Sequence, residues 1–322
     1  MPQWDLSQAE LESHRCTVPE PDGLDAFWTD TLAASRAAAK KPQFVDLGAV
    51  YGPTRVDDVT FSGGDGHPIR GWFARPREHA GALPCVVRFI GYGGGRGRPV
   101  DHLAFAASGI AVFVMDSRAQ GGEWGLGDTG DPGAGASGAE HPGVMTRGIA
   151  APGTYYFRRM FADAVRAVET AATHPEVDAS RIAVAGFSQG GALSLAAAAL
   201  APDMLKLTYA YMPFLCDIER AAQISPEAPY TEIAAYLSQQ ADRVDEVTRT
   251  LRHIDCALLA RRIRSRCRVS VGLMDTFCPP STVYAAYNAI ESPKELTVYP
   301  YTGHEETSVA RQRELEWILA NL

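Results

Sequence analysis

Long apolar runs are missing from this chain of 322 residues, and no stretch of eighteen or more apolar residues is available to span a bilayer. The N-terminal residues also lack the charged segment and following apolar segment of an export signal. The six cysteines form no C-x-x-C pair and no zinc-binding spacing. These absences predict a cytoplasmic protein with reduced thiols, no membrane contact and no metal.

Basic residues are also in the minority, because 30 Lys and Arg against 38 Asp and Glu leave a formal net charge of −8. They gather only in residues 258–268, without interleaved aromatic residues, so we expect a solvated helix face there and no nucleic-acid partner. Gly125, Gly127 and Gly130 match the spacing of a dinucleotide-binding motif, but they lie well beyond the preceding strand and open no helix. The sequence therefore predicts no cofactor.

The chain does contain an alternation of short apolar, β-branched runs with Ala-rich helical segments. This alternation predicts one α/β domain over residues 1–322, with a mostly parallel, doubly wound sheet and helices on both faces. We expect a helical arm over residues 1–50, an antiparallel hairpin around Gly63–Gly66 and a helical insertion over residues 216–264. The Gly- and Pro-rich segment Gly121–Pro152 is too long for a simple connection, so we expect it to be functional or to form an interface.

Ser188 lies where an apolar strand pattern changes to an Ala- and Leu-rich helix pattern, within the sequence GFSQGG. The flanking glycines permit a sharp, strained turn that would hold the serine hydroxyl clear of the sheet, as in a nucleophile elbow. A serine that merely begins a helix explains the same local pattern. Ser188 is therefore a candidate nucleophile that needs an acid and a histidine further along the chain.

Both partners follow Ser188 in the required order, each just beyond a predicted strand. Asp275 ends the strand pattern RVSVGLMD, and His304 follows the last strand pattern, LTVYP. Taken singly, Asp275 could cap a turn and His304 could belong to a surface pair with Glu305. Together, the order and the strand-end positions predict a Ser188–His304–Asp275 triad in which His304 is the general base and Asp275 orients it.

An oxyanion hole requires two N–H donors, one directly after the nucleophile and one in a loop after an earlier strand. Gln189 supplies the first, and Tyr92 in the loop FIGYGGGRG is the candidate for the second. The glycines of this loop would also suit a flexible turn. A phosphate-binding loop is excluded because the Gly-Lys-Ser/Thr ending is absent.

Several longer blocks resemble the acetyl xylan esterase and cephalosporin C deacetylase family, carbohydrate esterases with an α/β-hydrolase fold. The blocks are LDAFWTDTL, GYGGGRG, DSRAQGG, HPGVMTRGI, YYFRRMFADAVRAVE, GFSQGG, VGLMDTFCPPSTVYAAYN, KELTVYP and GHE. The resemblance implies the same triad and oxyanion residues, deacetylation of small acetyl esters and a homohexamer with inward-facing sites.

The resemblance also implies that Arg118 and Gln120 form a second signature and that Glu305 completes a terminal His-Glu pair. The signature usually reads Arg-Gly-Gln, whereas Ala119 stands at its centre here. A methyl group there is a mild departure unless the backbone needs a positive φ. From the residues alone, Arg118 suits an ion pair or a carbonyl contact that braces the loop.

Three functions remain open at this point. The first is a serine esterase that acts through an acetyl-Ser188 intermediate. An acyltransferase or a peptidase would use the same triad on the same fold. A hydrolase scaffold used only for binding would be a different class of protein, and such proteins commonly lose a triad residue.

Overall fold

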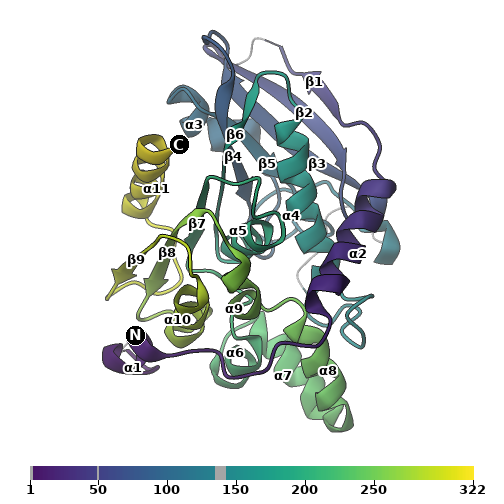
Figure 1. Cartoon of the computed structure of the whole chain (residues 1–322), viewed down its shortest axis with the longest axis vertical. Coiled ribbons are helices and arrows are strands. Elements are labelled where there is room, and N and C mark those ends of the chain that lie inside the picture. Colours follow the sequence, from purple (N-terminus) through teal and green to yellow (C-terminus); the bar gives the residue numbers. More distant parts are fainter. Residues whose placement is uncertain (1–2, 49–50, 135–142) are drawn as a thin grey trace.

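The computed structural model describes residues 3–48, 51–134 and 143–322. In these residues a nine-stranded sheet runs through the middle of the molecule (Figure 1), in the order β1-β2-β3-β5-β4-β6-β7-β8-β9. The strands are β1 (Gln43–Asp46), β2 (Thr54–Ser62), β3 (Pro68–Pro76), β4 (Leu83–Phe89), β5 (Ala111–Met115), β6 (Val177–Phe187), β7 (Leu207–Tyr211), β8 (Arg266–Gly272) and β9 (Lys294–Tyr299).

The sheet has an antiparallel part and a parallel part. β1 pairs antiparallel with β2, β2 pairs antiparallel with β3, and β3 joins β5 antiparallel as well. From β5 through β4, β6, β7 and β8 to β9, every pair is parallel. The carboxyl ends of the parallel strands therefore meet at one edge of the sheet, where α/β proteins place their sites.

Helices cover both faces of the sheet, as expected of apolar strands that are buried on both sides. The α-helices are α1 (Gln8–Ser13), α2 (Leu24–Ala37), α3 (Leu103–Ala107), α4 (Tyr156–Ala172), α5 (Gln189–Leu200), α6 (Ile218–Ile224), α7 (Tyr230–Gln239), α8 (Val244–Arg252), α9 (Cys256–Leu259), α10 (Pro280–Ala289) and α11 (Ser308–Asn321). None of the helices in the described residues is both long and apolar enough to cross a membrane.

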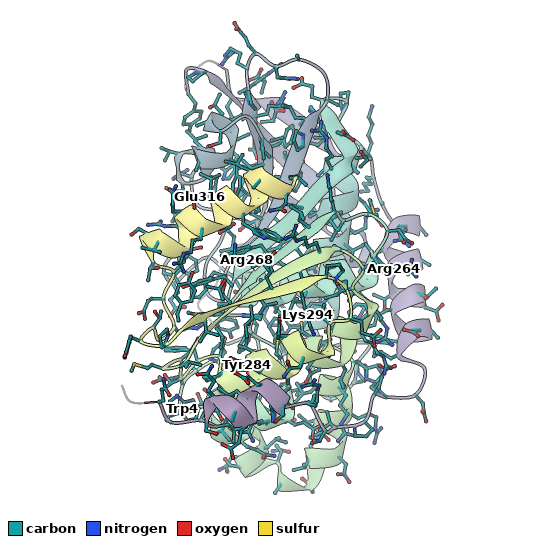
Figure 2. The ribbon with its side chains drawn as sticks, turned by 60° about the vertical axis from the view of Figure 1, so that its left-hand side comes forward. Trp4, Arg264, Arg268, Tyr284, Lys294 and Glu316 are labelled. Atoms are coloured by element: carbon teal, nitrogen blue, oxygen red, sulfur yellow. The ribbon has the colours of Figure 1, made fainter. Side chains whose placement is uncertain are left out.

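The two faces of the sheet carry separate cores. The larger core joins α2, α4, α5, α9 and α10 to one face, whereas α3 and α11 form the smaller core on the other. Figure 2 shows α11, which carries Glu316, in front of the strands. Trp317 on this helix packs against Tyr209, and its indole N–H lies 3.2 Å from Glu295 Oε1.

The predicted α/β-hydrolase arrangement is thus observed, including the hairpin of β2 and β3. The expected helical arm over residues 1–50 is wrong at its end, because Gln43–Asp46 extends the sheet as β1. The expected insertion contains α6, α7, α8 and α9, which gather beyond one end of the sheet (Figure 1). Part of the Gly- and Pro-rich segment, residues 135–142, lies outside the described residues.

Candidate active site

Ser188 lies at the turn between β6 and α5, directly before the first helical residue. Its backbone adopts φ 56° and ψ −117°, a strained conformation for a residue with a side chain. The Ser188 hydroxyl makes no capping hydrogen bond to the helix, so the interpretation of Ser188 as an ordinary helix-starting serine is wrong.

Glycine is required where α5 begins close to the neighbouring strand β4. An ideal Cβ on Gly190 would lie 2.3 Å from the Phe89 carbonyl oxygen, and one on Gly186 would lie 2.4 Å from the Gly190 carbonyl carbon. Both separations are much shorter than a van der Waals contact. The two glycines therefore let the strand and helix approach closely enough to form the turn at Ser188.

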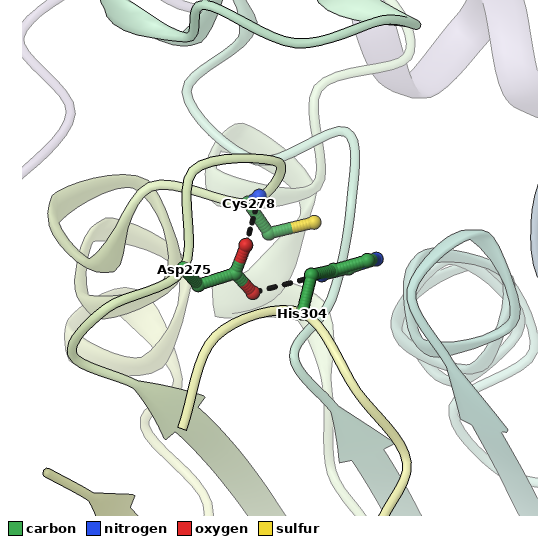
Figure 3. A group of neighbouring side chains, drawn as sticks. All are labelled: Asp275, Cys278 and His304. Atoms are coloured by element: carbon green, nitrogen blue, oxygen red, sulfur yellow. Dashed lines mark hydrogen bonds and ion pairs between the residues drawn. The ribbon is translucent and has the colours of Figure 1, made fainter. Parts of the chain in front are cut away.

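Asp275 and His304 reach Ser188 from loops after the carboxyl ends of β8 and β9, and Figure 3 shows the acid and the imidazole side by side. His304 Nε2 lies 2.9 Å from Ser188 Oγ, and His304 Nδ1 lies 2.8 Å from Asp275 Oδ2. The structure therefore brings all three predicted residues into one chain of hydrogen bonds.

The surroundings of Asp275 and His304 fix their orientation. Asp275 is fully buried, and its Oδ1 accepts hydrogen bonds from the Phe277 and Cys278 backbone N–H groups, both at 2.8 Å. The imidazole lies between the rings of Phe277 and Phe187, with centroid distances of 5.0 and 4.7 Å. When Nδ1–H donates to Asp275, Nε2 is left as the acceptor for the Ser188 hydroxyl proton.

Cys278, which the sequence analysis did not single out, lies beside this hydrogen-bonded chain (Figure 3). Ligand atoms of Asp275, Cys278 and His304 lie within 4.8 Å of one another, a spacing that also occurs in metal sites. Burial, aided by the charge of Asp275, raises the pKa of the Cys278 thiol well above its usual range. A protonated thiol next to an acid and a histidine that already bind each other fits proton transfer better than metal binding.

A cavity opens beside Ser188, and the loop after β4 forms another part of its wall. Tyr92 in this loop and Ser188 both line the cavity. The indole N–H of Trp124 donates to the Tyr92 carbonyl oxygen at 2.7 Å, and the Tyr92 hydroxyl donates to Glu232 Oε1 at 2.8 Å. That hydroxyl also accepts from the Val144 N–H at 2.9 Å. Tyr92 is thus anchored at both its main chain and its side chain.

The backbone N–H groups of Tyr92 and Gln189 are the predicted oxyanion donors. Within the described part of the chain, neither forms a backbone hydrogen bond. Gln189 is the first residue of α5, so its N–H belongs to the unpaired donors at a helix N-terminus. Neither N–H is therefore paired with the main chain, and both stay predicted oxyanion donors.

Gln120 connects the two sides of the site. Its Oε1 accepts from the Gly93 N–H at 2.8 Å, next to Tyr92 in the loop. Its Nε2 donates to Gln189 Oε1 at 2.9 Å and to the Tyr156 hydroxyl at 2.8 Å. A single buried amide thus links Gln189 to Gly93, the residue after Tyr92, which gives the second half of the signature a physical role.

Arg118 is fully buried and braces the loop after β5 that also carries Gln120, as expected from its residue type. Its Nε and Nη2 each lie 2.6 Å from an oxygen of Asp163, and its Nη1 lies 3.0 Å from Asp131 Oδ1. Burial acts to lower the pKa of Arg118, but the charges of Asp163 and Asp131 outweigh it and raise the pKa. The guanidinium is a buried structural cation that does not line the cavity.

Ala119, at the centre of the signature, has the positive φ that glycine would adopt without strain. Its φ is 49° and its side chain is fully buried. The exception that the sequence analysis allowed, a positive φ, therefore applies, and a Cβ in this conformation costs about 1 kcal/mol.

Glu305 is held near the site by its main chain. Its carbonyl oxygen accepts a hydrogen bond from the Tyr211 hydroxyl at 3.0 Å, whereas its side chain is exposed. The next residue, Glu306, lines the cavity and has its carboxylate 3.6 Å from Arg88. The structure thus places Glu305 beside His304 without giving its carboxylate a contact with the triad.

The cavity above Ser188 has a volume of about 560 Å³. Its walls are mainly aromatic, with three carboxylates at the side, and several of these residues were not predicted. The lining includes Tyr92, Glu123, Trp124, Phe187, Phe214, Pro229, Glu232, Phe277 and Glu306. A space of this size suits a small organic ligand.

Comparison with known proteins adds an independent observation. The family model described as Acetyl xylan esterase (AXE1) matches residues 1–321. An acetyl esterase of Xylanibacter ruminicola, Axe7A, is 26% identical over 320 residues, which cover 92% of this chain and 66% of that relative. This chain therefore spans slightly less than two thirds of that relative's length.

Two solved structures are similar over nearly their whole length. An acetyl xylan esterase from a Paenibacillus species has a TM-score of 0.91 and 35% identity, over 98% of this chain and 100% of that one. Acetyl xylan esterase 1 from a Thermoanaerobacterium species has a TM-score of 0.90 and 33% identity, over 98% of this chain and 99% of that one.

Proposed function

Because the chain belongs to the acetyl xylan esterase family of carboxylic ester hydrolases, we propose that it removes acetyl groups from small acetylated alcohols through an acetyl-Ser188 intermediate. The observation that carries this proposal is the hydrogen-bonded chain from Ser188 through His304 to the buried Asp275, at the wall of a cavity of about 560 Å³.

In the first half of the reaction, Ser188 Oγ attacks the acetyl carbonyl carbon while His304 Nε2 accepts the hydroxyl proton. The carbonyl oxygen becomes an oxyanion, which the Tyr92 and Gln189 N–H groups stabilise. The C–O bond to the alcohol then breaks, and His304 returns the proton to the departing alkoxide. Asp275 stabilises the imidazolium between these two proton transfers.

In the second half, a water molecule replaces the alcohol. His304 takes a proton from the water, and the resulting hydroxide attacks the acetyl carbonyl of the Ser188 ester. The tetrahedral intermediate collapses to acetic acid while His304 returns the proton to Ser188 Oγ, and the released acid then ionises to acetate in solution. The enzyme is thereby regenerated with no net proton uptake by the triad.

The cavity supports a compact acyl group and a ring-shaped alcohol. Aromatic residues such as Phe277 and Phe214 form its walls, and the exposed indole of Trp124 stands at its edge. An acetylated xylo-oligosaccharide and the acetyl ester of cephalosporin C are the two substrate classes that we propose. Both present an acetyl ester on a cyclic compound of suitable size.

The first experiment compares initial rates on p-nitrophenyl acetate, butyrate and octanoate for the wild type and Ser188→Ala. A steep preference for acetate that disappears with the substitution supports the proposal. Equal activity in the two proteins contradicts it. Parallel assays of acetate release from acetylated xylo-oligosaccharides and from cephalosporin C then separate the two substrate classes.

The remaining alternatives are tested on the same protein. Amide substrates detect a peptidase, added acceptor alcohols detect an acyltransferase, and a serine-reactive phosphonate that labels Ser188 stoichiometrically excludes a purely binding role. The family membership favours the esterase over the peptidase and the acyltransferase, and the complete set of triad residues favours it over a purely binding role.

Assembly and location belong to the same proposal. We expect a homohexamer, as the family resemblance implies, in a reducing cytoplasm, where the six unpaired cysteines would stay as thiols. Light scattering that gives the mass of one 34.7 kDa chain would contradict the hexamer.

A further inference from the structure

One carboxylate of the helical insertion reaches the loop that carries a proposed oxyanion donor. Glu232 lies in the first turn of α7, one of the insertion helices beyond the end of the sheet (Figure 1). Its Oε1 accepts a hydrogen bond from the Tyr92 hydroxyl at 2.8 Å. In the part of the chain that the structure describes, this is the one hydrogen bond between the insertion and the loop after β4. The Glu232 side chain also lines the cavity beside Ser188.

The start of α7 is fixed to the side of the site that carries the nucleophile. Tyr230, the first residue of the helix, is fully buried, and its hydroxyl accepts a hydrogen bond from the Leu215 N–H at 3.0 Å. The preceding residue, Phe214, donates its N–H to the Ser188 carbonyl oxygen at 3.0 Å. Glu232 therefore lies in a turn whose position is tied to the main chain of the nucleophile.

The side chains of Tyr92 and Glu232 also hold the end of the Gly- and Pro-rich segment. The Tyr92 hydroxyl accepts hydrogen bonds from the Gly143 and Val144 N–H groups, at 3.0 and 2.9 Å. Glu232 Oε2 accepts one from the Met145 N–H at 3.1 Å. Three segments that are far apart in the sequence thus meet at one phenol and one carboxylate.

The directions of these hydrogen bonds favour a carboxylate at position 232. Because the Tyr92 hydroxyl oxygen already accepts from two N–H groups, its own proton is left to donate, and a carboxylate offers no competing proton. Burial, followed by the charge of Glu232, raises the pKa of the Tyr92 hydroxyl well above its usual range, so the phenol keeps this proton. A glutamine has the same size, but its NH₂ group would meet a donor at either Tyr92 or Met145.

We propose that Glu232 is a positioning residue of the esterase reaction, which holds the Tyr92 side chain against the start of α7 and thereby keeps the Tyr92 backbone N–H in place for the oxyanion. This inference rests on the proposed function, because the oxyanion forms only when Ser188 attacks an ester. The side-chain contact acts on the same residue as the donor, so its loss lets the donor move. A displacement of about 1 Å can lower a rate about 10²-fold.

The test compares Glu232→Gln, Tyr92→Phe and the double variant, each in the full-length protein. Each single change should lower kcat for p-nitrophenyl acetate about 10- to 10²-fold, with KM changed by less than about threefold. Because both changes act on one hydrogen bond, the double variant should be at most about threefold slower than the slower single variant. Glu246→Gln in α8 is the matched control. Glu246 pairs with Arg243 where both side chains are partly exposed, so kcat should stay within about twofold.

Two further measurements separate positioning from a loss of folded protein. Titration with a serine-reactive phosphonate gives the concentration of reactive Ser188, so that kcat is expressed per active site. Trifluoroacetone serves as a reversible inhibitor that reports on the oxyanion donors. Ser188 Oγ adds to its carbonyl carbon, His304 accepts the hydroxyl proton and the carbonyl oxygen becomes an oxyanion. The inhibition constant should rise in Glu232→Gln by about the factor by which kcat falls.

Three outcomes overturn this inference alone. They are a wild-type kcat in Glu232→Gln, an inhibition constant for trifluoroacetone that Glu232→Gln leaves unchanged, and losses that add fully in the double variant. The last result would mean that Glu232 acts without Tyr92. A wild type that hydrolyses no ester, or one whose activity survives Ser188→Ala, contradicts the proposed function and this inference with it.

Discussion

The two sides of the candidate active site are built in different ways. On one side, Ser188, Asp275 and His304 stand directly after parallel strands, and the sheet fixes where they meet. On the other side, Tyr92 and Gln120 lie in loops without regular structure, held by buried hydrogen bonds and ion pairs. The sheet side thus depends on backbone pairing, and the loop side depends on individual polar side chains.

This difference teaches where a substitution should act. On the sheet side a side chain can be removed with little effect on the fold, so the loss appears in catalysis. On the loop side the side chains hold the backbone, so their removal costs stability or positions the oxyanion donors less well. The five predictions below test that division, in order of decreasing free energy.

The largest effect is expected for Ser188→Ala. Loss of the nucleophile should lower kcat for p-nitrophenyl acetate by about 10⁶-fold, toward the rate that the oxyanion donors alone support. Steady-state kinetics and a melting curve measure it, with Ser194→Ala in α5, the helix that follows Ser188, as the control. The Ser194 hydroxyl only bonds the Gly190 carbonyl oxygen, so kcat should change by less than about threefold. A large loss of stability in Ser188→Ala would contradict the expectation that substitutions on the sheet side affect catalysis and leave the fold intact.

Arg118→Met should mainly affect stability. Removing the buried guanidinium leaves the buried Asp163 without its ion-pair partner, although Asp131 keeps Arg159, and this should cost about 3–5 kcal/mol of unfolding free energy. Urea denaturation measures this, against Arg264→Met as the control. Arg264 pairs with Asp203 where both side chains are exposed, so that change should stay within about 0.5 kcal/mol. An equal loss of unfolding free energy in the two variants would show that burial does not determine how much an ion pair stabilises this protein.

Acid should weaken the loop side through His102, whose Nε2 lies 2.9 Å from the Arg96 carbonyl oxygen. Burial, and then the charge of Arg88, lower the pKa of His102 to about 4. Between pH 6.5 and 4, His102 is protonated in the unfolded chain but stays neutral in the folded protein. The free energy of unfolding therefore falls as pH falls, by up to about 3 kcal/mol.

The check is urea denaturation at pH 7 and pH 4.5 for the wild type and His102→Gln. The amide of glutamine can still reach the Arg96 carbonyl, but it does not titrate. The wild type should therefore lose more stability than the variant on acidification. The same loss in both proteins would assign the acid sensitivity to other groups.

Gln120→Leu tests the residue that joins the two sides of the site, and it should lower catalysis. The substitution removes the bonds from Gly93 and to Gln189, so the two oxyanion donors are held less well. We expect kcat to fall about 10- to 10²-fold with little change in KM, since the donors act mainly in the transition state. A change in KM alone would contradict this role.

The smallest effect is a gain. Ala119→Gly should stabilise the protein by about 1 kcal/mol, because glycine adopts the observed φ of 49° without the Cβ strain. Thermal unfolding measures the gain, and kcat should stay within about threefold of the wild type. A lower melting temperature would mean that the buried Ala119 methyl contributes more by packing than it costs in strain.

Much of the sheet side could be predicted from the sequence. The apolar runs gave the strands, GFSQGG gave the turn at Ser188, and Asp275 and His304 were found because each follows a strand pattern in the order a triad requires. The helical arm was overextended at Gln43–Asp46, because a short edge strand of four residues carries little periodicity.

The contacts on the loop side could not be predicted as well, because they leave little pattern in the sequence. Nothing near Gln120 in the sequence indicates that it binds Gln189, which is 69 residues away, or that the Tyr92 hydroxyl would find Glu232, 140 residues away in the insertion. The positive φ of Ala119 is also hidden, since alanine is the wrong residue for that conformation. The aromatic walls of the cavity come from segments with no common pattern.

The sequence by itself determined the order of strands and helices along the chain and the chemistry of the proposed triad, because hydrophobic periodicity and turn residues act over a few positions. Only the tertiary structure decided which distant polar groups meet, from the Gln120 link with Gln189 to the bond between the Tyr92 hydroxyl and Glu232. The physical reason is that burial leaves each such group dependent on whichever partner the chain path brings within about 3 Å.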